Sequence, residues 1–309
     1  MSISATLVKE LREKTSAGMM DCKKALEAAN GDFEAAVEWL RVKGLSSASK
    51  KADRIAAEGT VFAQVNGDTG VVVEINSETD FVARNDGFRN LVSDIAHHVL
   101  NVVNATGDIL EQMFHKNPTK KVGEMLKEAI ATIGENIVIR RFEKYTATAN
   151  TLVHTYVHGE GKIGVMIEVA VSDAKATSNP ELKTFAQDVA LHIAAMNPMA
   201  VSSEQIPTEV VEKEREILKA KNLEAGKKAD MVDKIVEGQI RKFLAENCLM
   251  DQAFVKNPDM KVSDLAKETG KKIGADVSVK RFVRFELGAG IEKKSTDFAA
   301  EVAEQMKGH

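Results

Sequence analysis

The chain has 309 residues, of which 44% are apolar and 28% are charged, so it is long enough for two or three domains with ordinary cores. Aromatic residues make up only 5% and the net charge is −4, which argues against a basic, aromatic-rich surface for direct nucleic-acid binding. No apolar run approaches the roughly 20 residues of a membrane helix, and the N-terminus lacks a secretory signal pattern. Cys22 and Cys248 are the only cysteines, which excludes a disulfide framework and favours a cytoplasmic location.

The first 43 residues are predicted to form a compact unit of three helices. Ser4 can cap the first helix, in which Leu7, Val8 and Leu11 share one face. Gly18 breaks this helix, and a second helix is expected to restart near Asp21.

The third helix is expected to enter through Gly31-Asp32 and to end at Gly44. The pattern resembles small helical bundles of the ubiquitin-associated type, including an apolar Met19-Met20 pair in the connection after the first helix. We therefore expect a ubiquitin-associated-like module over residues 1–45. A polar linker, in part helical, is expected over residues 46–59.

An internal duplication follows. GVVVEI at 70–75 matches GVMIEV at 164–169, with an offset of 94 residues. The segments at 114–142 and 254–282 share Phe, Lys-Asn-Pro, Lys-Val, Ile-Gly and Arg-Phe without gaps, at an offset of 140. Each half is predicted to contain strand, turn, strand, two helices and a final strand. The expected fold is therefore α+β, with small antiparallel sheets covered by helices.

The change of offset places a 46-residue insertion in the second half. We thus expect a first core half at 60–150, a second half at 151–199 and 251–287, and an inserted helical hairpin at 200–250 with Gly226 at its turn. The hairpin is either a packed subdomain or an arm for a partner or a second copy. A final module at 288–309 is predicted to contain a short helix with Phe298 on its apolar stripe.

Motifs for catalysis are not found. GEGKIG at 159–164 is too short for a phosphate loop and aligns with a hairpin turn of the first half, so it is interpreted as a β-turn. His97 and His98 are adjacent on a helix and cannot easily share a metal ion, and His192 repeats only the second of them. Both repeated histidines are therefore expected to be packed. No acidic residue was identified in a suggestive apolar setting, so the sequence predicts a non-enzyme without cofactor or bound metal.

Features present in one half alone are the candidates for function. INSETDFVARNDGF at 75–88 places Asp80 and Phe81 in a turn that the second half retains without them. Phe81 is either an exposed contact or an anchor under its own sheet. His158, in the turn HGEGK, is likewise absent from the matching hairpin of the first half.

The chain resembles the bacterial elongation factor Ts family along nearly its whole length. The resemblance rests on the N-terminal helices, on TDFVAR at 79–84, on IGENIVIRR at 133–141, and on RFELGAGIEKKSTDFAAEV near the C-terminus. It implies guanine nucleotide exchange on the translational GTPase elongation factor Tu, and it identifies the inserted hairpin with the coiled-coil subdomain of the family.

The resemblance also implies roles for particular residues. The residues that contact the partner and disturb its Mg²⁺ would be Thr79, Asp80, Phe81 and Val82. Further partner contacts would be Met19, Met20, His158 and Phe298, although the two methionines could instead close the core of their own bundle. Self-association through the hairpin is a further expectation. Two other functions remain open at this point: an interaction scaffold without exchange activity, and a metal-dependent hydrolase that uses the histidines.

Overall fold

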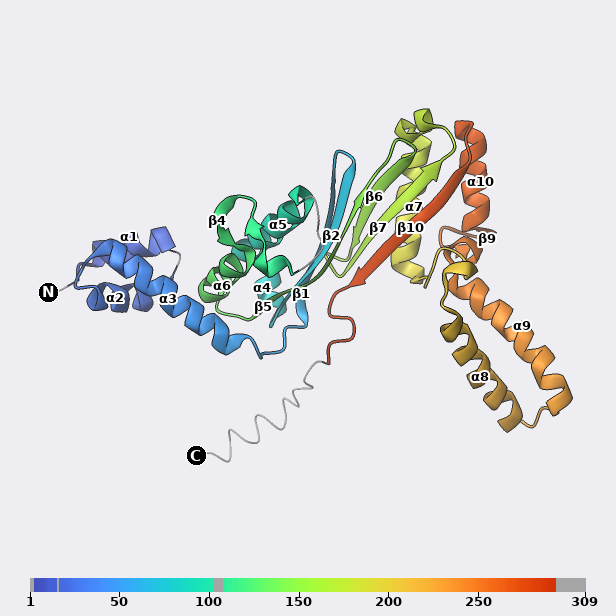
Figure 1. The fold of residues 1–309 in the computed structure, drawn as a ribbon, viewed down its shortest axis with the longest axis horizontal. Coiled ribbons are helices and arrows are strands. Elements are labelled where there is room, and N and C mark those ends of the chain that lie inside the picture. Colours follow the sequence, from blue (N-terminus) through green and yellow to red (C-terminus); the bar gives the residue numbers. More distant parts are fainter. Residues whose placement is uncertain (1–2, 16, 103–107, 293–309) are drawn as a thin grey trace. The chain divides into compact units, whose positions relative to one another are not determined.

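The protein has an α+β fold in which small sheets are combined with helices (Figure 1). The computed structural model describes residues 3–15, 17–102 and 108–292. Two compact units are formed, one from Met1–Thr60, Val73–Phe142 and Leu287–His309, the other from Val61–Val72 and Glu143–Glu286. The boundary between the units crosses the first hairpin.

The first unit begins with three helices: α1 (Ala5–Thr15), α2 (Met19–Ala28) and α3 (Phe33–Lys51). They enclose a small core around Val8, Leu11 and Leu26. The Ser4 hydroxyl accepts a hydrogen bond from the Leu7 amide at 3.1 Å, which confirms the predicted start of α1.

Two helix boundaries differ from the sequence-based expectation. Helix α2 begins at Met19 rather than near Asp21, so Met19 and Met20 form its first turn instead of a loop. Helix α3 continues through Gly44 to Lys51, into the segment expected to be a linker. A β-carbon on Gly44 would lie 2.8 Å from the β-carbon of Ala131, so this glycine permits close helix packing and does not end the helix.

The first half of the duplication then follows, with the strands and helices β1 (Glu58–Asn66), β2 (Thr69–Ser77), α4 (Asp80–Ala83), α5 (Asp86–Asn101), η1 (Ile109–Glu111), β3 (Met113–Phe114), β4 (Asn117–Lys121), α6 (Val122–Ile133) and β5 (Ile137–Thr146). The second half contains β6 (Thr151–His158), β7 (Ile163–Val171), η2 (Ala174–Ser178), α7 (Pro180–Met196), η3 (Ser203–Gln205), α8 (Thr208–Glu224), α9 (Ala229–Asn247), η4 (Leu249–Asp251), β8 (Ala253–Phe254), β9 (Asn257–Lys261), α10 (Val262–Ile273) and β10 (Val277–Glu286).

The two halves have the same strand order. The first sheet has the order β1-β2-β5 and the second has the corresponding order β6-β7-β10, each with the Val-rich strand in the middle. The small pairs β3-β4 and β8-β9 were not predicted. Their first strands have only two residues each, which is too short for an alternating pattern to be recognised.

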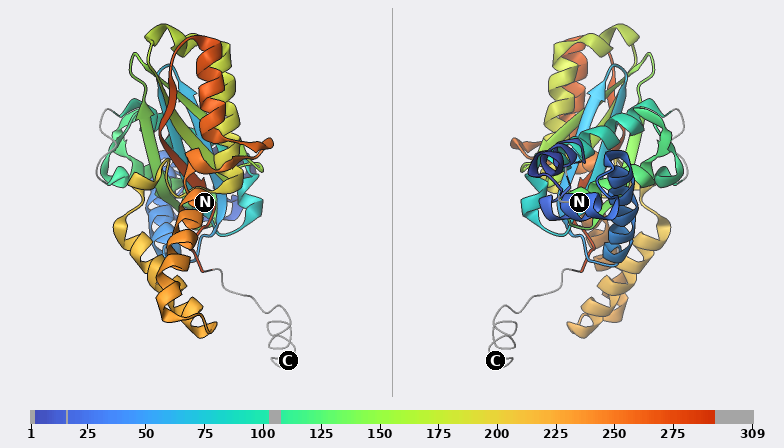
Figure 2. Two further views of the ribbon diagram at one scale, coloured as in Figure 1. Left: turned by 90° about the vertical axis from the view of Figure 1, so that its right-hand side faces the viewer. Right: turned by 90° about the vertical axis from the view of Figure 1, so that its left-hand side faces the viewer.

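Helices α7 and α10 cover one face of the second sheet (Figure 2). Leu182, Phe185, Val189 and Ile193 recur at three- and four-residue spacing on α7 and are fully buried or nearly so. They pack against alternate residues of β7 such as Ile167. This cluster is the main core of the second unit.

Gly70 and Gly164, which occupy equivalent positions in the two halves, allow the strands of the second unit to pack closely. A β-carbon on Gly164 would lie 2.4 Å from a methyl group of Val61, and one on Gly70 would lie 2.6 Å from a methyl group of Val153. Any larger residue would push the strands apart.

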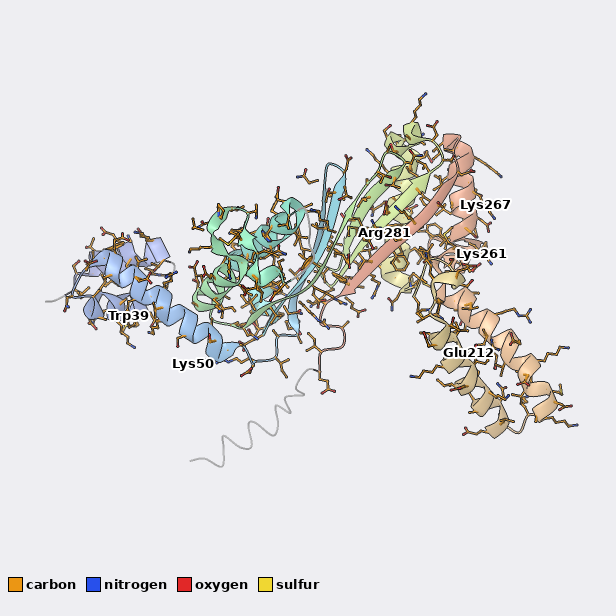
Figure 3. All side chains as sticks on the ribbon, in the orientation of Figure 1. Trp39, Lys50, Glu212, Lys261, Lys267 and Arg281 are labelled. Carbon is orange, nitrogen blue, oxygen red and sulfur yellow. The ribbon has the colours of Figure 1, made fainter. Side chains whose placement is uncertain are left out.

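Each half buries one glutamate inside its central strand, which the sequence analysis did not anticipate. The Glu168 carboxylate is fully buried and accepts hydrogen bonds from Lys280 at 3.0 Å and Arg281 at 2.6 Å, both on β10. Arg281 is labelled on this strand in Figure 3. Burial alone would raise the pKa of Glu168, but the bonds from Arg281 and Lys280 outweigh it and leave the pKa below its ordinary value. The Arg281 guanidinium also lies 3.9 Å from the centre of the Tyr145 ring.

Glu74 is the equivalent residue of the first half. It accepts hydrogen bonds from Arg140 at 2.9 Å and Arg141 at 2.6 Å, and from the Gly288 amide at 2.8 Å. The sequence-based interpretation that no acidic residue lies in a suggestive apolar setting is therefore wrong for Glu74 and Glu168. The reason is that each glutamate has two cations on the neighbouring strand.

Helices α8 and α9 form the inserted hairpin. The ion pairs Arg215–Glu237 and Lys219–Asp233 link them in antiparallel register. The apolar side chains between them form a cluster separate from the main core, made of Val232, Val236 and Ile240 with Val211, Leu218 and Leu244. At the base of the hairpin, Ala200 pairs with Cys248, so the chain enters and leaves the core at adjacent positions.

We expect the hairpin to be dispensable for folding of the core. Replacing residues 207–246 by a short Gly/Ser linker removes the separate cluster but leaves the Ala200–Cys248 pairing, so the melting temperature should fall by less than about 5 °C. Thermal unfolding followed by circular dichroism checks this result. Loss of a single cooperative transition would show that the hairpin is part of the core.

None of the helices within the described ranges is long and apolar enough to cross a membrane.

Candidate partner-binding site

The segment after β2 forms a short helical turn. Residues Asp80–Ala83 make one helical turn, α4, before Asn85 starts α5 by accepting hydrogen bonds from the amides of Gly87 and Phe88. Val82 points inward and is only 9% exposed. Its side chain therefore anchors the turn.

Phe81 is 78% exposed at the tip of this turn. The alternative that Phe81 anchors its own sheet is therefore wrong. The Asp80 side chain is also exposed and lies 3.8 Å from the Arg84 guanidinium. An exposed pair of this kind contributes little to stability, so Asp80 is available to another molecule.

Residues that the sequence analysis missed hold the turn in place. The Glu135 carboxylate accepts two hydrogen bonds from Thr79, one from the hydroxyl at 2.7 Å and one from the amide at 3.0 Å. The amide of Asn136 donates to the Glu78 carboxylate at 2.6 Å. Comparison of IGEN at 133–136 with IGAD at 273–276 could have drawn attention to Glu135, because Ala275 occupies its position in the second half.

The second half shows which parts of the turn belong to the fold. Ala176 is buried at the position of Val82, and Asn179 caps α7 as Asn85 caps α5. Lys175 stands at the position of Phe81. The shared residues thus make the turn, and the acidic and aromatic side chains on it are additions of the first half.

His158 lies exposed at the end of β6, and its Nδ1 is 2.9 Å from the Tyr156 hydroxyl. Its strand pairs with β7 up to Ile163, and residues 159–161 have positive φ angles. The interpretation of GEGKIG as a hairpin turn is therefore confirmed. The Tyr156 hydroxyl thus occupies Nδ1 of the His158 imidazole.

Met19 and Met20 are 57% and 63% exposed, so neither closes the core of the helical module. Both lie in the first turn of α2. Phe298 lies outside the described residues.

His98 and His192 are packed helix histidines, as predicted. Each is fully buried, with Nε2 at 3.0 and 2.9 Å from the side-chain oxygen of Gln112 and Gln252, respectively. Nδ1 of each accepts a backbone amide hydrogen bond, so the ring is neutral and donates from Nε2. Burial lowers the pKa of both rings. In the parts of the chain that the structure describes, no three His, Cys, Asp or Glu side chains are grouped to hold a metal ion.

Phe81 is a large aromatic side chain held on the surface by a turn that is bonded to the rest of its unit, which makes it a candidate contact with another molecule. The fold is thus a duplicated α+β fold, and the exposed turn of its first half is the candidate surface for contact with another protein.

Comparison with known proteins gives the family. The family model "Elongation factor TS" matches residues 78–289. The chain is 75% identical to the elongation factor Ts of Bdellovibrio bacteriovorus over 309 residues, which cover both chains completely. It is 47% identical to that of Symbiobacterium thermophilum, with 98% of each chain covered, and 49% identical to that of Nitratiruptor sp., with 99% of this chain and 100% of the relative covered. The chain belongs to the elongation factor Ts family.

Proposed function

We propose that the protein is a guanine nucleotide exchange factor for elongation factor Tu in the cytoplasm. It acts by binding and carries out no covalent chemistry. The observation that supports this best is Phe81, whose ring stands 78% exposed on a turn held by Thr79 and Glu135. Elongation factor Tu is proposed as the partner because the chain belongs to the elongation factor Ts family.

Phe81 is proposed to enter a gap between elements of the partner near its nucleotide. Burying this ring would contribute about 2–3 kcal/mol, enough to stabilise a displaced arrangement of the partner. A Mg²⁺ ion bound with GDP requires near-ideal octahedral geometry, so a shift of its surroundings by about 1 Å weakens its binding. Loss of the ion then weakens the binding of the GDP diphosphate to the partner.

Asp80 is proposed to act beside Phe81, either by accepting hydrogen bonds from the partner or by disturbing the water shell of the cation. Only the weak contact with Arg84 has to be given up. Val82 contributes by fixing the turn from inside. Met19, Met20, His158 and Phe298 are proposed as further contacts, and self-association through the hairpin remains a prediction.

Exchange follows from linkage between the two ligands of the partner. If the factor weakens GDP binding by a given ratio, GDP weakens binding of the factor by the same ratio. GTP or GDP can therefore release the factor, and the nucleotide in excess determines the product.

The direct test is stopped-flow release of a fluorescent GDP analogue from elongation factor Tu, with and without the protein. We expect release to accelerate and to reach a plateau as the protein concentration rises. Complex formation without faster release would show that the protein is an interaction scaffold and would refute the exchange function.

Replacement of His158 by alanine should slow exchange modestly, by about two- to fivefold, because one peripheral polar contact is lost. The imidazole is exposed, and its hydrogen bond within the described part of the chain is to Tyr156, so the melting temperature should not change. Tyr156→Phe is the matched variant: it keeps His158 but frees its orientation, and should give a smaller effect. If His158→Ala promotes exchange as fast as the unaltered protein at both low and saturating concentrations, His158 does not contact the partner and is only part of its turn.

A further inference from the structure

Glu135 connects the exposed turn to the body of the first unit. It lies in the connection between α6 and β5, and its two carboxylate oxygens each accept one hydrogen bond from Thr79. Hydrogen bonds to a carboxylate are stronger than those between neutral groups. The Thr79 hydroxyl is thereby directed to Glu135 and makes no capping bond to α4.

The backbone at Thr79 is held by a second contact, because the Ser77 hydroxyl donates a hydrogen bond to the Thr79 carbonyl at 2.9 Å. Helix α4 has only four residues, which is far too short to be stable alone. Val82 anchors it by burial, but Phe81 and Asp80 project outward without packing. The orientation of the Phe81 ring therefore depends on the backbone just before it, at Thr79.

The duplication separates this contact from the requirements of the fold. In the second half, the Asp276 amide donates to Ser172 at 2.8 Å, which repeats the tie between Asn136 and Glu78. Ala275, however, stands at the position of Glu135 and has no side chain that could bind the turn. Asp173, at the position of Thr79, instead accepts a bond from the Lys175 amide of its own turn.

We propose that Glu135 is a positioning residue for the partner-binding turn. Its two bonds to Thr79 fix α4 before the partner arrives, so that Phe81 enters without first having to be ordered. The contact between Glu135 and Thr79 occurs in the half that carries Phe81 and not in the other half. This is expected of a contact that serves partner binding, whereas a contact required by the fold would occur in both halves. The inference rests on the proposed function, because the orientation of Phe81 matters only if its ring contacts the partner.

The experiment measures GDP-analogue release from elongation factor Tu at increasing concentrations of each variant, giving a plateau rate and a half-saturating concentration. For Glu135→Ala we expect the plateau rate to fall about five- to tenfold, because ordering the turn is added to the exchange step. The half-saturating concentration should stay within about twofold, since the peripheral contacts are intact. Glu135→Gln should restore most of the rate, because its amide can accept from the Thr79 amide and donate to the hydroxyl.

Two further variants distinguish positioning from a general structural role. In the Phe81→Ala background, Glu135→Ala should cause no further loss, because there is no ring left to orient. Ser172→Ala is the matched control: it breaks the tie that both halves share, in the half without Phe81, and should leave exchange unchanged. If Glu135→Ala lowers the melting temperature, Thr79→Val, which removes only the hydroxyl bond, should still lower the plateau rate.

The proposal would be overturned if Glu135→Ala or Thr79→Val kept the plateau rate of the unaltered protein. It would also be overturned if Glu135→Ala lowered the plateau rate by the same factor in the Phe81→Ala background as in the unaltered protein. These outcomes differ from failure of the proposed function, in which the unaltered protein would not accelerate release or Phe81→Ala would retain full activity.

Discussion

Replacing Phe81 by alanine is expected to lower the accelerated rate of GDP release from elongation factor Tu at least tenfold, which corresponds to about 1.4 kcal/mol of lost coupling. The ring can shift the nucleotide equilibrium only if it contacts the free and the GDP-bound partner differently. Because it is 78% exposed in the free protein, its removal should change the free energy of unfolding by less than about 0.5 kcal/mol.

Lys175→Ala is the matched control for this variant. Lys175 occupies the position of Phe81 in the second half, on the equivalent turn, which is capped by Asp173, and its removal should leave exchange unaltered. An intact Phe81→Ala protein with full exchange activity would place the contact elsewhere on the surface. Early melting of that variant would contradict the exposed position of the ring.

Asp80→Ala should also lower the rate, and its effect should shrink when Mg²⁺ is removed by a chelator. The reason is that a cation already absent cannot be disturbed by the carboxylate. The double variant should lose less than the sum of the single losses, because the two neighbouring residues act on one site. Release measured with Mg²⁺ and with chelator decides both points, and an undiminished effect of Asp80→Ala in chelator would restrict Asp80 to partner hydrogen bonding.

The largest expected effect on stability belongs to Glu168. Its carboxylate is fully buried, and Glu168→Ala would leave Lys280 and Arg281 without their common partner. Removing one member of a buried ion pair costs about 3–5 kcal/mol, and we expect the lower end, about 3 kcal/mol, because both cations are about half exposed and keep part of their hydration. Denaturant unfolding measures this, with the exposed Glu143→Ala on β5 as the control that should change little.

The contribution of Glu168 should depend on pH with a definite sign. Its pKa is lower in the folded than in the unfolded protein, so the stabilisation is complete above the unfolded value of about 4.3 and is lost as the pH falls through the folded value. The difference in stability between the unaltered protein and Glu168→Gln should thus be constant from pH 7 to about pH 5 and should shrink in more acidic solution. A difference that stays constant down to about pH 3 would show that the charge of Glu168 is not what stabilises the fold.

Much of the fold follows from the sequence, because local patterns carry it. Ser4 caps α1 where its position predicts, since an N-cap needs only the residues of its own first turn. The duplication predicted two halves with the same succession of strands and helices, because equal spacing of apolar residues leads to equal packing. The family resemblance, and through it the partner, also rests on residues adjacent in the chain.

Other features were decided only by contacts between distant segments. Gly44 would end an isolated helix, but close packing against Ala131 lets α3 continue to Lys51. Glu168 interrupts an apolar run, and only the pairing of β7 with β10, more than 100 residues further along the chain, supplies the cations that allow its burial.

The candidate site shows the same division. The sequence marked Asp80 and Phe81 as an unusual pair in a turn, but it left open whether the ring was buried or exposed. Exposure depends on how the turn lies against the rest of the unit, and that is determined by Val82 on the inside and by Glu135, 56 residues beyond Thr79, on the other side. Propensity and spacing act over a few residues, whereas hydrogen bonds between distant loops depend on the folded backbone, so only the tertiary structure determines where Phe81 points.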